Sequence, residues 1–366
     1  MELSELQKRI VTAPDDKMVV ISRAATGKTR CLTERVRYWL KNGVDPSQIC
    51  AITFTNLAAN EMQVRLDEDY KDGMFIGTIH SLAARFLSMG GYGSKVGSAI
   101  NDDKFELFFT YIQKYPTCVQ HFDYVLVDEA QDLAYDEYYF IFKMINPEHF
   151  FVVGDPFQCI YEGMNHASDK YMNELLKDST VGKYDLNENY RNKANILKYA
   201  QKSLKPINLV DNSIPMSIGG KIYECKFSGF DRLAEWINSA DTYKDWAVLC
   251  YTNNEVDDVM EGLEEFDIPT LNFNQRKKTK AEIDKLMSQN KVKVLTVWGA
   301  KGLGFKNVIV YGYNWLANRK GERVERYRLD YVAYTRAMDS LMVCIRNMIL
   351  NLFILIHLLH YVILIS

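Results

Sequence analysis

Short apolar segments rich in Val, Ile, Phe and Tyr alternate along the chain with segments whose apolar residues recur at helical spacing. The apolar segments of the first half are MVVIS, ICAITF, MFIGT, YVLVD and FFVVGD, and those of the second half are KIYECKF, WAVLCY, KVLTV, VIVYG and LMVCI. Apolar runs of this length, separated by amphipathic helices, are typical of parallel sheets that helices cover. The pattern therefore predicts an α/β protein with two parallel sheets in two lobes, divided near residue 180.

Composition and charge limit the classes of function. The chain has 366 residues, of which 48% are hydrophobic and 25% charged, as in soluble globular proteins of two domains. Its net charge of −3 gives no overall attraction to nucleic acid, so such contacts would need a local groove. The seven cysteines include no C-x-x-C pair, and the N-terminus has no signal-peptide pattern, so we expect a cytoplasmic protein, or one of the host-cell cytoplasm if viral.

The C-terminal end is unusual because residues 348–366, MILNLFILIHLLHYVILIS, carry no formal charge. This length just reaches that of a membrane span, and Arg346 precedes it. A buried terminal helix and a shifted reading frame are the alternatives. We expect one of these two rather than a membrane anchor.

The clearest candidate chemistry lies in VVISRAATGKTR, residues 19–30. An apolar strand leads through Gly-Lys-Thr into an amphipathic helix, which is the context that a phosphate-binding loop requires. Backbone N–H groups and the helix N-terminus attract phosphate, Lys28 adds a full positive charge, and Thr29 can ligate Mg²⁺.

One position of this loop departs from the usual G-x-x-x-x-G-K-[ST] pattern. Ser22 stands where the first glycine is expected. Since Ser22, Arg23 and Ala25 are small or can point outward, we expect the backbone still to approach a phosphate closely.

A second candidate site follows another apolar strand, in YVLVDEAQD. Asp128 and Glu129 stand at the carboxyl end of this strand, where ligands bind in α/β sheets. Asp128 would hold Mg²⁺ through water, and Glu129 would orient or deprotonate an attacking water. An acidic surface turn is the alternative, which the phosphate loop about 100 residues earlier disfavours.

Eight segments in a fixed order resemble superfamily 1 helicases of the UvrD/Rep type. They are ELSELQKRIV, AITFTNLAANEMQVRL, GTIHSLAARFL, VLVDEAQD, VVGDPFQCIY, LNENYRN, VLTVWGAKGLGFKNVIV and LDYVAYTRAMDSLMV. The resemblance spans about residues 3–345. It implies two RecA-like P-loop NTPase lobes, residues 1–180 and 181–345, before the apolar tail 346–366. It also implies Mg²⁺-ATP as fuel and 3′→5′ movement on single-stranded DNA.

The resemblance assigns roles around the nucleotide. Gln7 would read the adenine edge, and Arg30 and Tyr190 would stack on its two faces. Gln158 would sense the γ-phosphate and couple it to the DNA groove. The phosphate loop would be formed by Ser22, Ala24, Ala25, Thr26, Gly27, Lys28 and Thr29. The charge on the transferring phosphoryl group would be stabilised by arginines of the second lobe, Arg191 and Arg336.

The resemblance also implies a nucleic-acid groove whose hydroxyl and amide groups suit phosphate oxygens and carry no sequence information. Its residues would be Thr53, Thr55, Asn56, Thr78, His80, Ser81, Tyr161, Thr296 and Lys301. His80 has an alternative reading as a packed or capping histidine. RNA stays open as a substrate, because backbone contacts without a 2′-OH reader hardly discriminate it from DNA.

The chain departs from the family in three respects. Trp298 replaces a histidine, and Gly304 replaces a glutamate expected near the nucleotide sugar. The Trp or Phe that often follows the tyrosine at Tyr161 is missing, which removes a stacking contact of about 1–3 kcal/mol per base. The inserted subdomains are absent, since about 40 residues separate GTIHSL from VLVDEAQD. Unwinding is therefore a weaker expectation than ATP hydrolysis.

Several functions fit these motifs. The preferred one is an ATP-dependent helicase or translocase acting on single strands or on single–double-strand junctions. The alternatives are a DNA-stimulated ATPase that needs a repair or replication partner to unwind, and a nucleotide-gated DNA-binding module without turnover. A small-molecule P-loop kinase is disfavoured because NYR and TRA would have no purpose there. We expect no membrane partner.

Overall fold

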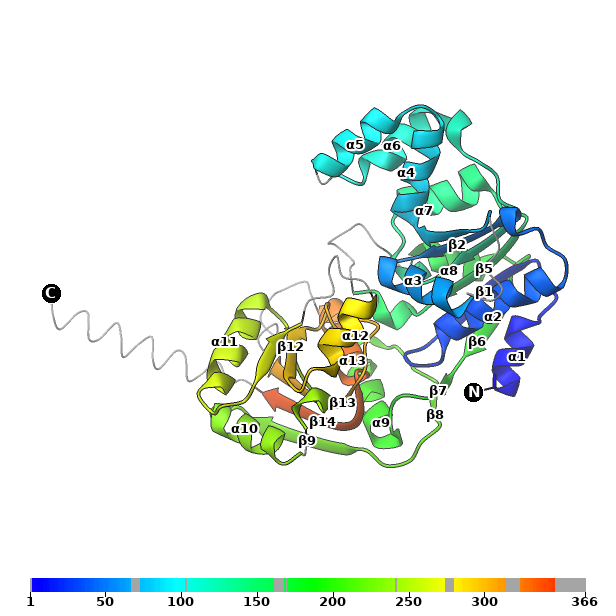
Figure 1. Cartoon of the computed structure of the whole chain (residues 1–366). Helices are drawn as coiled ribbons and strands as arrows, with labels where there is room; N and C mark the ends of the chain where they lie inside the picture. The colour runs from blue at the N-terminus through cyan, green and yellow to red at the C-terminus, as the bar shows by residue number, and fades with distance from the viewer. Residues whose placement is uncertain are drawn as a thin grey trace. The chain divides into compact units, whose positions relative to one another are not determined.

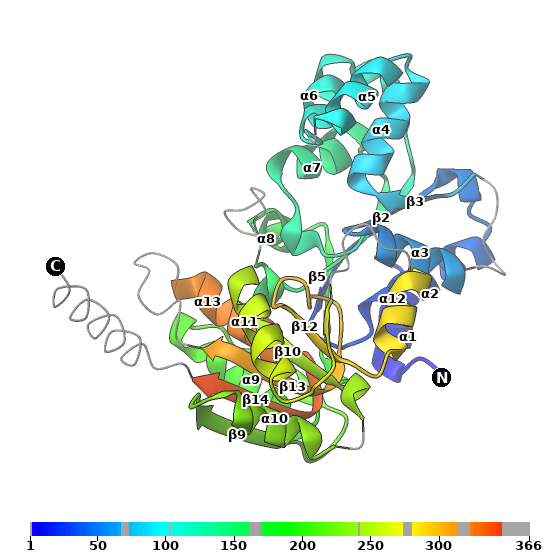
Figure 2. The ribbon, with the colours of Figure 1, turned by 60° about the vertical axis from the view of Figure 1, so that its left-hand side comes forward.

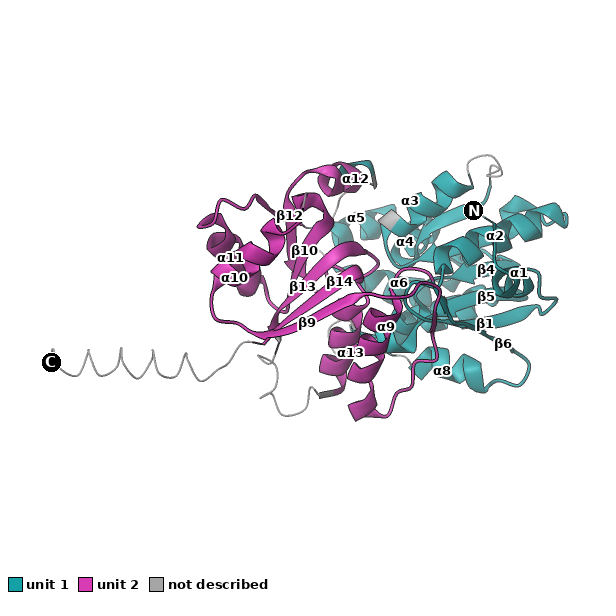
Figure 3. Cartoon of the chain, turned by 90° about the horizontal axis from the view of Figure 1, so that it is seen from below, with its two compact units in different colours: residues 1–189, 278–282 teal, residues 190–277, 283–366 magenta. Residues whose placement is uncertain are grey.

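The computed structural model describes residues 2–66, 73–102, 104–160, 168, 170–240, 242–273, 280–313 and 323–345. The chain divides into two compact units (Figure 3). Unit 1 comprises residues 1–189 and 278–282, and unit 2 comprises residues 190–277 and 283–366. Each unit is built on a six-stranded parallel sheet with helices, so the predicted α/β class is confirmed.

The sheet of unit 1 has the strand order β3-β2-β4-β5-β1-β6 (Figure 1). Its strands are β1 (Lys17–Ser22), β2 (Ile49–Thr53), β3 (Phe75–Thr78), β4 (Tyr124–Val127), β5 (His149–Gly154) and β6 (Gly182–Leu186). The first five match the apolar segments of the sequence. The strand β6 has no such pattern, because only its last residue is fully buried.

Helices cover both faces of this sheet. They are α1 (Glu5–Val11), α2 (Lys28–Lys41), α3 (Asn56–Arg65), α4 (Ile79–Met89), α5 (Gly93–Asn101), α6 (Leu107–Lys114), α7 (Tyr135–Tyr139), the π-helix η4 (Phe140–Ile145) and α8 (Lys170–Lys177). Figures 1 and 2 show α5 and α6 beside α4.

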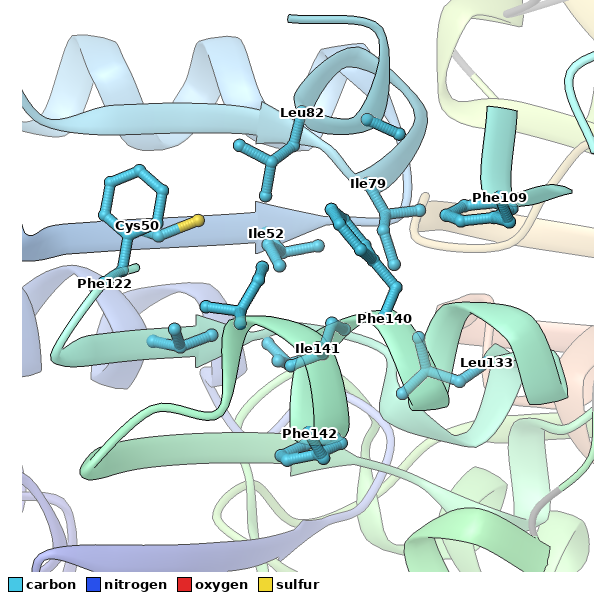
Figure 4. Close-up of a cluster of buried hydrophobic side chains, with 14 of the residues drawn as sticks. Cys50, Ile52, Ile79, Leu82, Phe109, Phe122, Leu133, Phe140, Ile141 and Phe142 are labelled. Atoms are coloured by element: carbon cyan, nitrogen blue, oxygen red, sulfur yellow. The ribbon is translucent and has the colours of Figure 1, made fainter. Parts of the chain in front are cut away.

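Alternate residues of each strand enter two separate cores, as the period of a strand requires. Val19 and Ile52 join the core under α4, α6 and η4, which Figure 4 shows in part. Val20 and Ala51 join the core under α1, α2 and α3. A strand buried on both faces needs apolar residues at every position, which is why these strands are readable from the sequence.

Unit 2 has the strand order β11-β12-β10-β13-β14-β9. Its strands are β9 (Lys221–Lys226), β10 (Trp246–Cys250), β11 (Thr270–Asn272), β12 (Val292–Thr296), β13 (Phe305–Tyr313) and β14 (Ala337–Ile345). Its helices are α9 (Ala194–Ser203), α10 (Phe230–Asn238), α11 (Asn253–Glu264) and α13 (Arg323–Tyr334), together with α12 (Lys280–Ser288) from residue 283 on. The short strands β7 (Glu188–Asn189) and β8 (Ile214–Pro215) lie outside the two large sheets. The sequence missed β11, which has only three residues.

Within the described ranges, no helix has the length and apolar character needed to cross a membrane. The apolar tail 346–366 and Tyr161 lie outside the described residues, so their predictions stay predictions.

Candidate nucleotide-binding site

Three loops of unit 1 meet at the carboxyl edge of its sheet. In register, Ile21 of β1 lies beside Gly154 of β5, and Val127 of β4 lies beside Val152 of β5. The loops that follow β1, β4 and β5 therefore emerge side by side, at the edge where α/β sheets bind ligands.

The loop after β1 has the conformation of an anion-binding loop. Ala25 and Gly27 have positive φ angles of 62° and 86°. The helix α2 starts at Lys28 without a side-chain cap and without an acidic residue in its first turn. Its N-terminal N–H groups and the positive end of its dipole therefore favour a bound anion such as phosphate.

Ser22, which replaces the expected glycine, is fully buried. Its hydroxyl lies 2.7 Å from Oγ1 of Thr26, which in turn donates to the carbonyl of Arg23 at 2.9 Å. The two hydroxyls thus link the two ends of the loop by a hydrogen bond inside it. A glycine at position 22 could not make this bond.

Arg23 does not point outward, so that expectation is wrong. Only 8% of its surface is exposed, and its guanidinium lies 3.9 Å from the centre of the Phe157 ring. Its Nη1 is 3.5 Å from Oδ1 of Asp155. Stacking on the ring and attraction to the carboxylate favour the inward orientation.

Two side chains from distant segments hold the phosphate loop. Gln7 on α1 donates from Nε2 to the carbonyl of Thr26 at 3.1 Å, and its Oε1 accepts from the N–H of Ser4. Asn189, fully buried, donates from Nδ2 to the carbonyl of Ala24 at 3.0 Å. The contact of Gln7 with adenine stays a prediction. The role of Asn189 was missed, although it stands in the quoted segment LNENYRN.

The structure brings together Lys28, Asp128 and Glu129. Nζ of Lys28 lies 2.7 Å from Oε1 of Glu129, and the N–H of Glu129 donates to Oδ1 of Asp128 at 2.9 Å. Burial lowers the pKa of Lys28, but the charges of Glu129, Asp128 and Asp155 raise it more, so the net shift is upward and the ammonium stays charged at neutral pH. Glu129 has φ 51° and ψ 41°, a strained backbone conformation that is common at functional sites.

Gln131 and Asp155 extend this cluster, and neither was predicted from the sequence. Gln131, fully buried, donates from Nε2 to Oε2 of Glu129 at 2.6 Å and accepts the N–H of Asp155 at 2.8 Å. Asp155 accepts from Nε2 of Gln158 at 2.7 Å. A Cβ on Gly154 would lie 2.8 Å from Oε1 of Gln131, so a glycine permits this approach. The sequence offered one indication of their roles, because Gln131 lies in the segment VLVDEAQD and Asp155 in the segment VVGDPFQ.

Arg30 lies on α2, at a depression of about 340 Å³ in the surface of unit 1. The depression is lined by Arg30, Thr33, Glu34, Arg37 and Arg65. Glu34 pairs with Arg37 at 2.7 Å. The stacking of Arg30 on adenine stays a prediction.

The first-lobe residues predicted to contact DNA lie at the ends of β2 and β3, where Thr53 and Thr78 are direct neighbours. Thr55 caps α3, and Thr78 caps α4 by accepting the N–H of Ser81. Thr53 is buried, whereas Thr55, Asn56 and Ser81 are exposed. The hydroxyls thus have local capping roles, and their contacts with DNA stay predictions.

His80 is partly packed. Its ring lies edge-on to Phe105 and Phe109, with centroids 6.0 and 5.4 Å away, and its Nε2 is 3.9 Å from Oε1 of Glu137. Burial lowers the pKa of His80 below its usual 6.5, so the ring is neutral at pH 7. This environment fits the packed-histidine alternative, and a DNA contact would be by hydrogen bonding rather than by charge.

In unit 2, Arg336 follows α13 and is 1% exposed. Its guanidinium donates to the carbonyls of Val332 and Leu303 at 2.9 and 3.1 Å. Asn192 donates to the carbonyls on either side of this arginine, those of Thr335 and Ala337. Side-chain hydrogen bonds therefore stabilise the turn that carries Arg336.

Arg191 of unit 2 lies beside Gly304. A Cβ on Gly304 would be 3.0 Å from Nε of Arg191 and 2.9 Å from Cε of Met338, so a small residue leaves room for this arginine. Tyr190 is exposed by 43% of its surface.

The second-lobe residues predicted to contact DNA follow β12. Oγ1 of Thr296 accepts the N–H of Gly299 at 3.1 Å, and Lys301 lies in the turn that follows. No observation tests the predicted roles of Tyr190, Arg191, Thr296, Lys301 and Arg336, which stay predictions.

Two family models match the chain: the UvrD/REP helicase N-terminal domain, at residues 3–114 and 107–180, and the UvrD-like helicase C-terminal domain, at residues 271–347. A probable DNA helicase of Mycoplasma pneumoniae is 27% identical over 93% of this chain and 82% of that protein. A probable DNA helicase II homolog of the same organism is 26% identical over 72% of this chain and 53% of its own length. DNA helicase II of Escherichia coli is 40% identical over 90 residues, 23% of this chain and 12% of that protein. The chain therefore belongs to the UvrD/Rep-type DNA helicases.

Proposed function

We propose that this chain hydrolyses ATP to move 3′→5′ along single-stranded DNA, and that it separates strands during cytoplasmic replication, repair or recombination. The observation that carries the proposal is the cluster at the carboxyl edge of unit 1. There the charged Lys28 lies 2.7 Å from Glu129, next to the uncapped N-terminus of α2. Its substrates would be single strands or single–double-strand junctions.

The contacts of Lys28 indicate how the site would work. In the structure its ammonium pairs with the Glu129 carboxylate. Phosphate oxygens would compete for that ammonium and release one carboxylate oxygen of Glu129. The released oxygen would then orient an attacking water and accept its proton, while Gln131 keeps the other oxygen in place.

The donor set fits Mg²⁺. Thr29 and Asp128 would supply a hydroxyl and a carboxylate beside the phosphate loop. Among the described residues, no group of three or more His, Cys, Asp and Glu side chains is placed to hold a metal. Mg²⁺ usually takes only one or two carboxylates together with water and substrate phosphates, so a small protein donor set suits it. When bound, Mg²⁺ would neutralise charge on the phosphates.

A second candidate is a DNA-stimulated ATPase that needs a partner protein to unwind. The small size of the segment between β3 and β4 favours this candidate, since its described residues form only the short helices α4, α5 and α6 and the 3₁₀ turn η2 (Pro116–Cys118). Translocation needs two lobes, whereas efficient strand separation in larger members involves the inserted subdomains that this chain lacks.

The first test is ATP hydrolysis by the full chain with and without single-stranded DNA, beside Lys28→Ala and Glu129→Gln. We expect DNA to stimulate hydrolysis and each substitution to lower kcat by about 10²–10⁴-fold, the usual contribution of such groups. Lys41→Ala, an exposed lysine at the end of the same helix, is the matched control. Binding of nucleotide and DNA without turnover would instead identify a nucleotide-gated binding module.

A strand-displacement assay tests the proposed direction of movement and the proposed substrate. Duplexes with a 3′ or a 5′ single-stranded tail, of DNA or RNA, report direction and substrate. Hydrolysis without displacement of any of these would favour the partner-dependent ATPase. Displacement from 5′ tails alone would contradict the proposed direction.

A further inference from the structure

Arg23 lies inside unit 1, although it belongs to the loop after β1 that is predicted to bind phosphate. Its guanidinium stacks on Phe157 at 3.9 Å and faces Asp155 at 3.5 Å, and its N–H donates to the carbonyl of Leu186 at 3.3 Å. Burial of a guanidinium is costly unless a partner compensates it. The first two contacts hold the guanidinium against the loop after β5, and the third holds the backbone of Arg23 beside β6.

Asp155 joins this arginine to the predicted phosphate sensor. The carboxylate is fully buried, and its Oδ1 also accepts the N–H of Phe157 at 3.0 Å. Its Oδ2 accepts from Nε2 of Gln158 at 2.7 Å. The Gln158 amide and the Arg23 guanidinium thus share one buried carboxylate.

Asp155 is also connected by hydrogen bonds to Glu129, the proposed catalytic carboxylate. Its N–H donates to Oε1 of Gln131, whose Nε2 donates to Oε2 of Glu129. A continuous series of polar contacts therefore runs from Arg23 through Asp155 and Gln131 to Glu129, all within unit 1.

We propose that Arg23 is a positioning residue that acts through Asp155 on the Gln158 amide and so couples the phosphate loop to the nucleotide sensor. This inference rests on the proposed function. The Arg23 guanidinium offsets part of the negative charge of the Asp155 carboxylate. The hydrogen bond that this carboxylate accepts from the Gln158 amide is weaker as a result. Without the guanidinium the buried carboxylate holds Gln158 more tightly, and the amide turns less readily toward a phosphate.

The test substitutes Arg23 in two ways in the full chain. Arg23→Met keeps a long side chain over Phe157 but removes the charge, and Arg23→Lys keeps the charge but removes the planar guanidinium. Arg9→Met, an exposed arginine on α1, is the matched control. The readouts are kcat and KM for ATP with and without DNA, and the ratio of Kd values for a fluorescent non-hydrolysable ATP analogue with and without oligo(dT).

We expect Arg23→Met to lower DNA-stimulated kcat by about tenfold while KM changes less than about threefold, and to bring the Kd ratio toward one. Arg23→Lys should lie between this variant and the wild type. In a Gln158→Ala background, Arg23→Met should have no further effect, because the two residues act as one unit.

Additive losses in that double variant, or a Kd ratio unchanged by Arg23→Met, would overturn the proposal. Circular dichroism and urea unfolding check that each variant is folded. The Kd ratio is defined even for a chain that does not turn over ATP, so failure of the proposed ATPase and failure of this coupling are separate results.

Discussion

The carboxyl group of Asp330 makes the stability of unit 2 depend on pH. The side chain lies on α13 with 1% of its surface exposed. It accepts from Oη of Tyr251 at 2.5 Å, and Nε of Arg326 lies 4.0 Å from its other oxygen. Burial raises the pKa of Asp330 to about 7, from an ordinary value of 3.8, although the Tyr251 hydroxyl and the Arg326 charge act in the opposite direction.

The sign of the pH effect follows from this shift. Between pH 3.8 and about 7 the folded chain keeps the proton on Asp330, whereas the unfolded chain has lost it. The free energy of unfolding therefore falls as the pH rises through this range, and the loss is complete above about pH 7. About three pH units at about 1.4 kcal/mol each give a penalty of about 4 kcal/mol.

We expect Asp330→Asn to relieve this penalty, because the amide stays neutral and its oxygen still accepts from Tyr251. Relative to the wild type, the stability of the variant should rise by about 2 kcal/mol between pH 5.5 and pH 8.5. The assay is urea unfolding of the full chain at both pH values. Asp284→Asn, at an exposed aspartate of α12, is the control. A difference between the variant and the wild type that does not change with pH would refute the reasoning.

Three further predictions concern ATP hydrolysis. Asn189→Ala removes a support of the phosphate loop and should raise KM for ATP by about three- to tenfold in steady-state hydrolysis; an unchanged KM would contradict the role of that bond. Gln131→Glu places a second carboxylate beside Glu129, so the acid limb of the kcat–pH profile should move to higher pH, and a limb that stays in place argues against the contact. Gly304→Glu restores the glutamate of the family pattern, but it crowds Arg191 and should lower kcat; a higher kcat would show that the space can be filled.

The sequence by itself determined ten of the twelve strands of the two large sheets and the position of the phosphate loop. A strand buried on both faces must be apolar at every position, so β1 to β5 are visible as runs. Asp128 and Glu129 follow β4 directly, Lys28 follows β1 after a short loop, and parallel strands bring their carboxyl ends to one edge. The strand β6 lacks this signal because only its last residue is fully buried.

Only the tertiary structure decided which polar side chains meet at that edge. Arg23 turns inward because the loop after β5 offers an aromatic face and a carboxylate. Gln131 reaches Asp155 across 24 positions, and Asn189 reaches Ala24 across 165. A local sequence pattern predicts the turn, helix or strand to which a residue belongs. The order in which strands join the sheet sets such distant partners, and no local pattern contains that order.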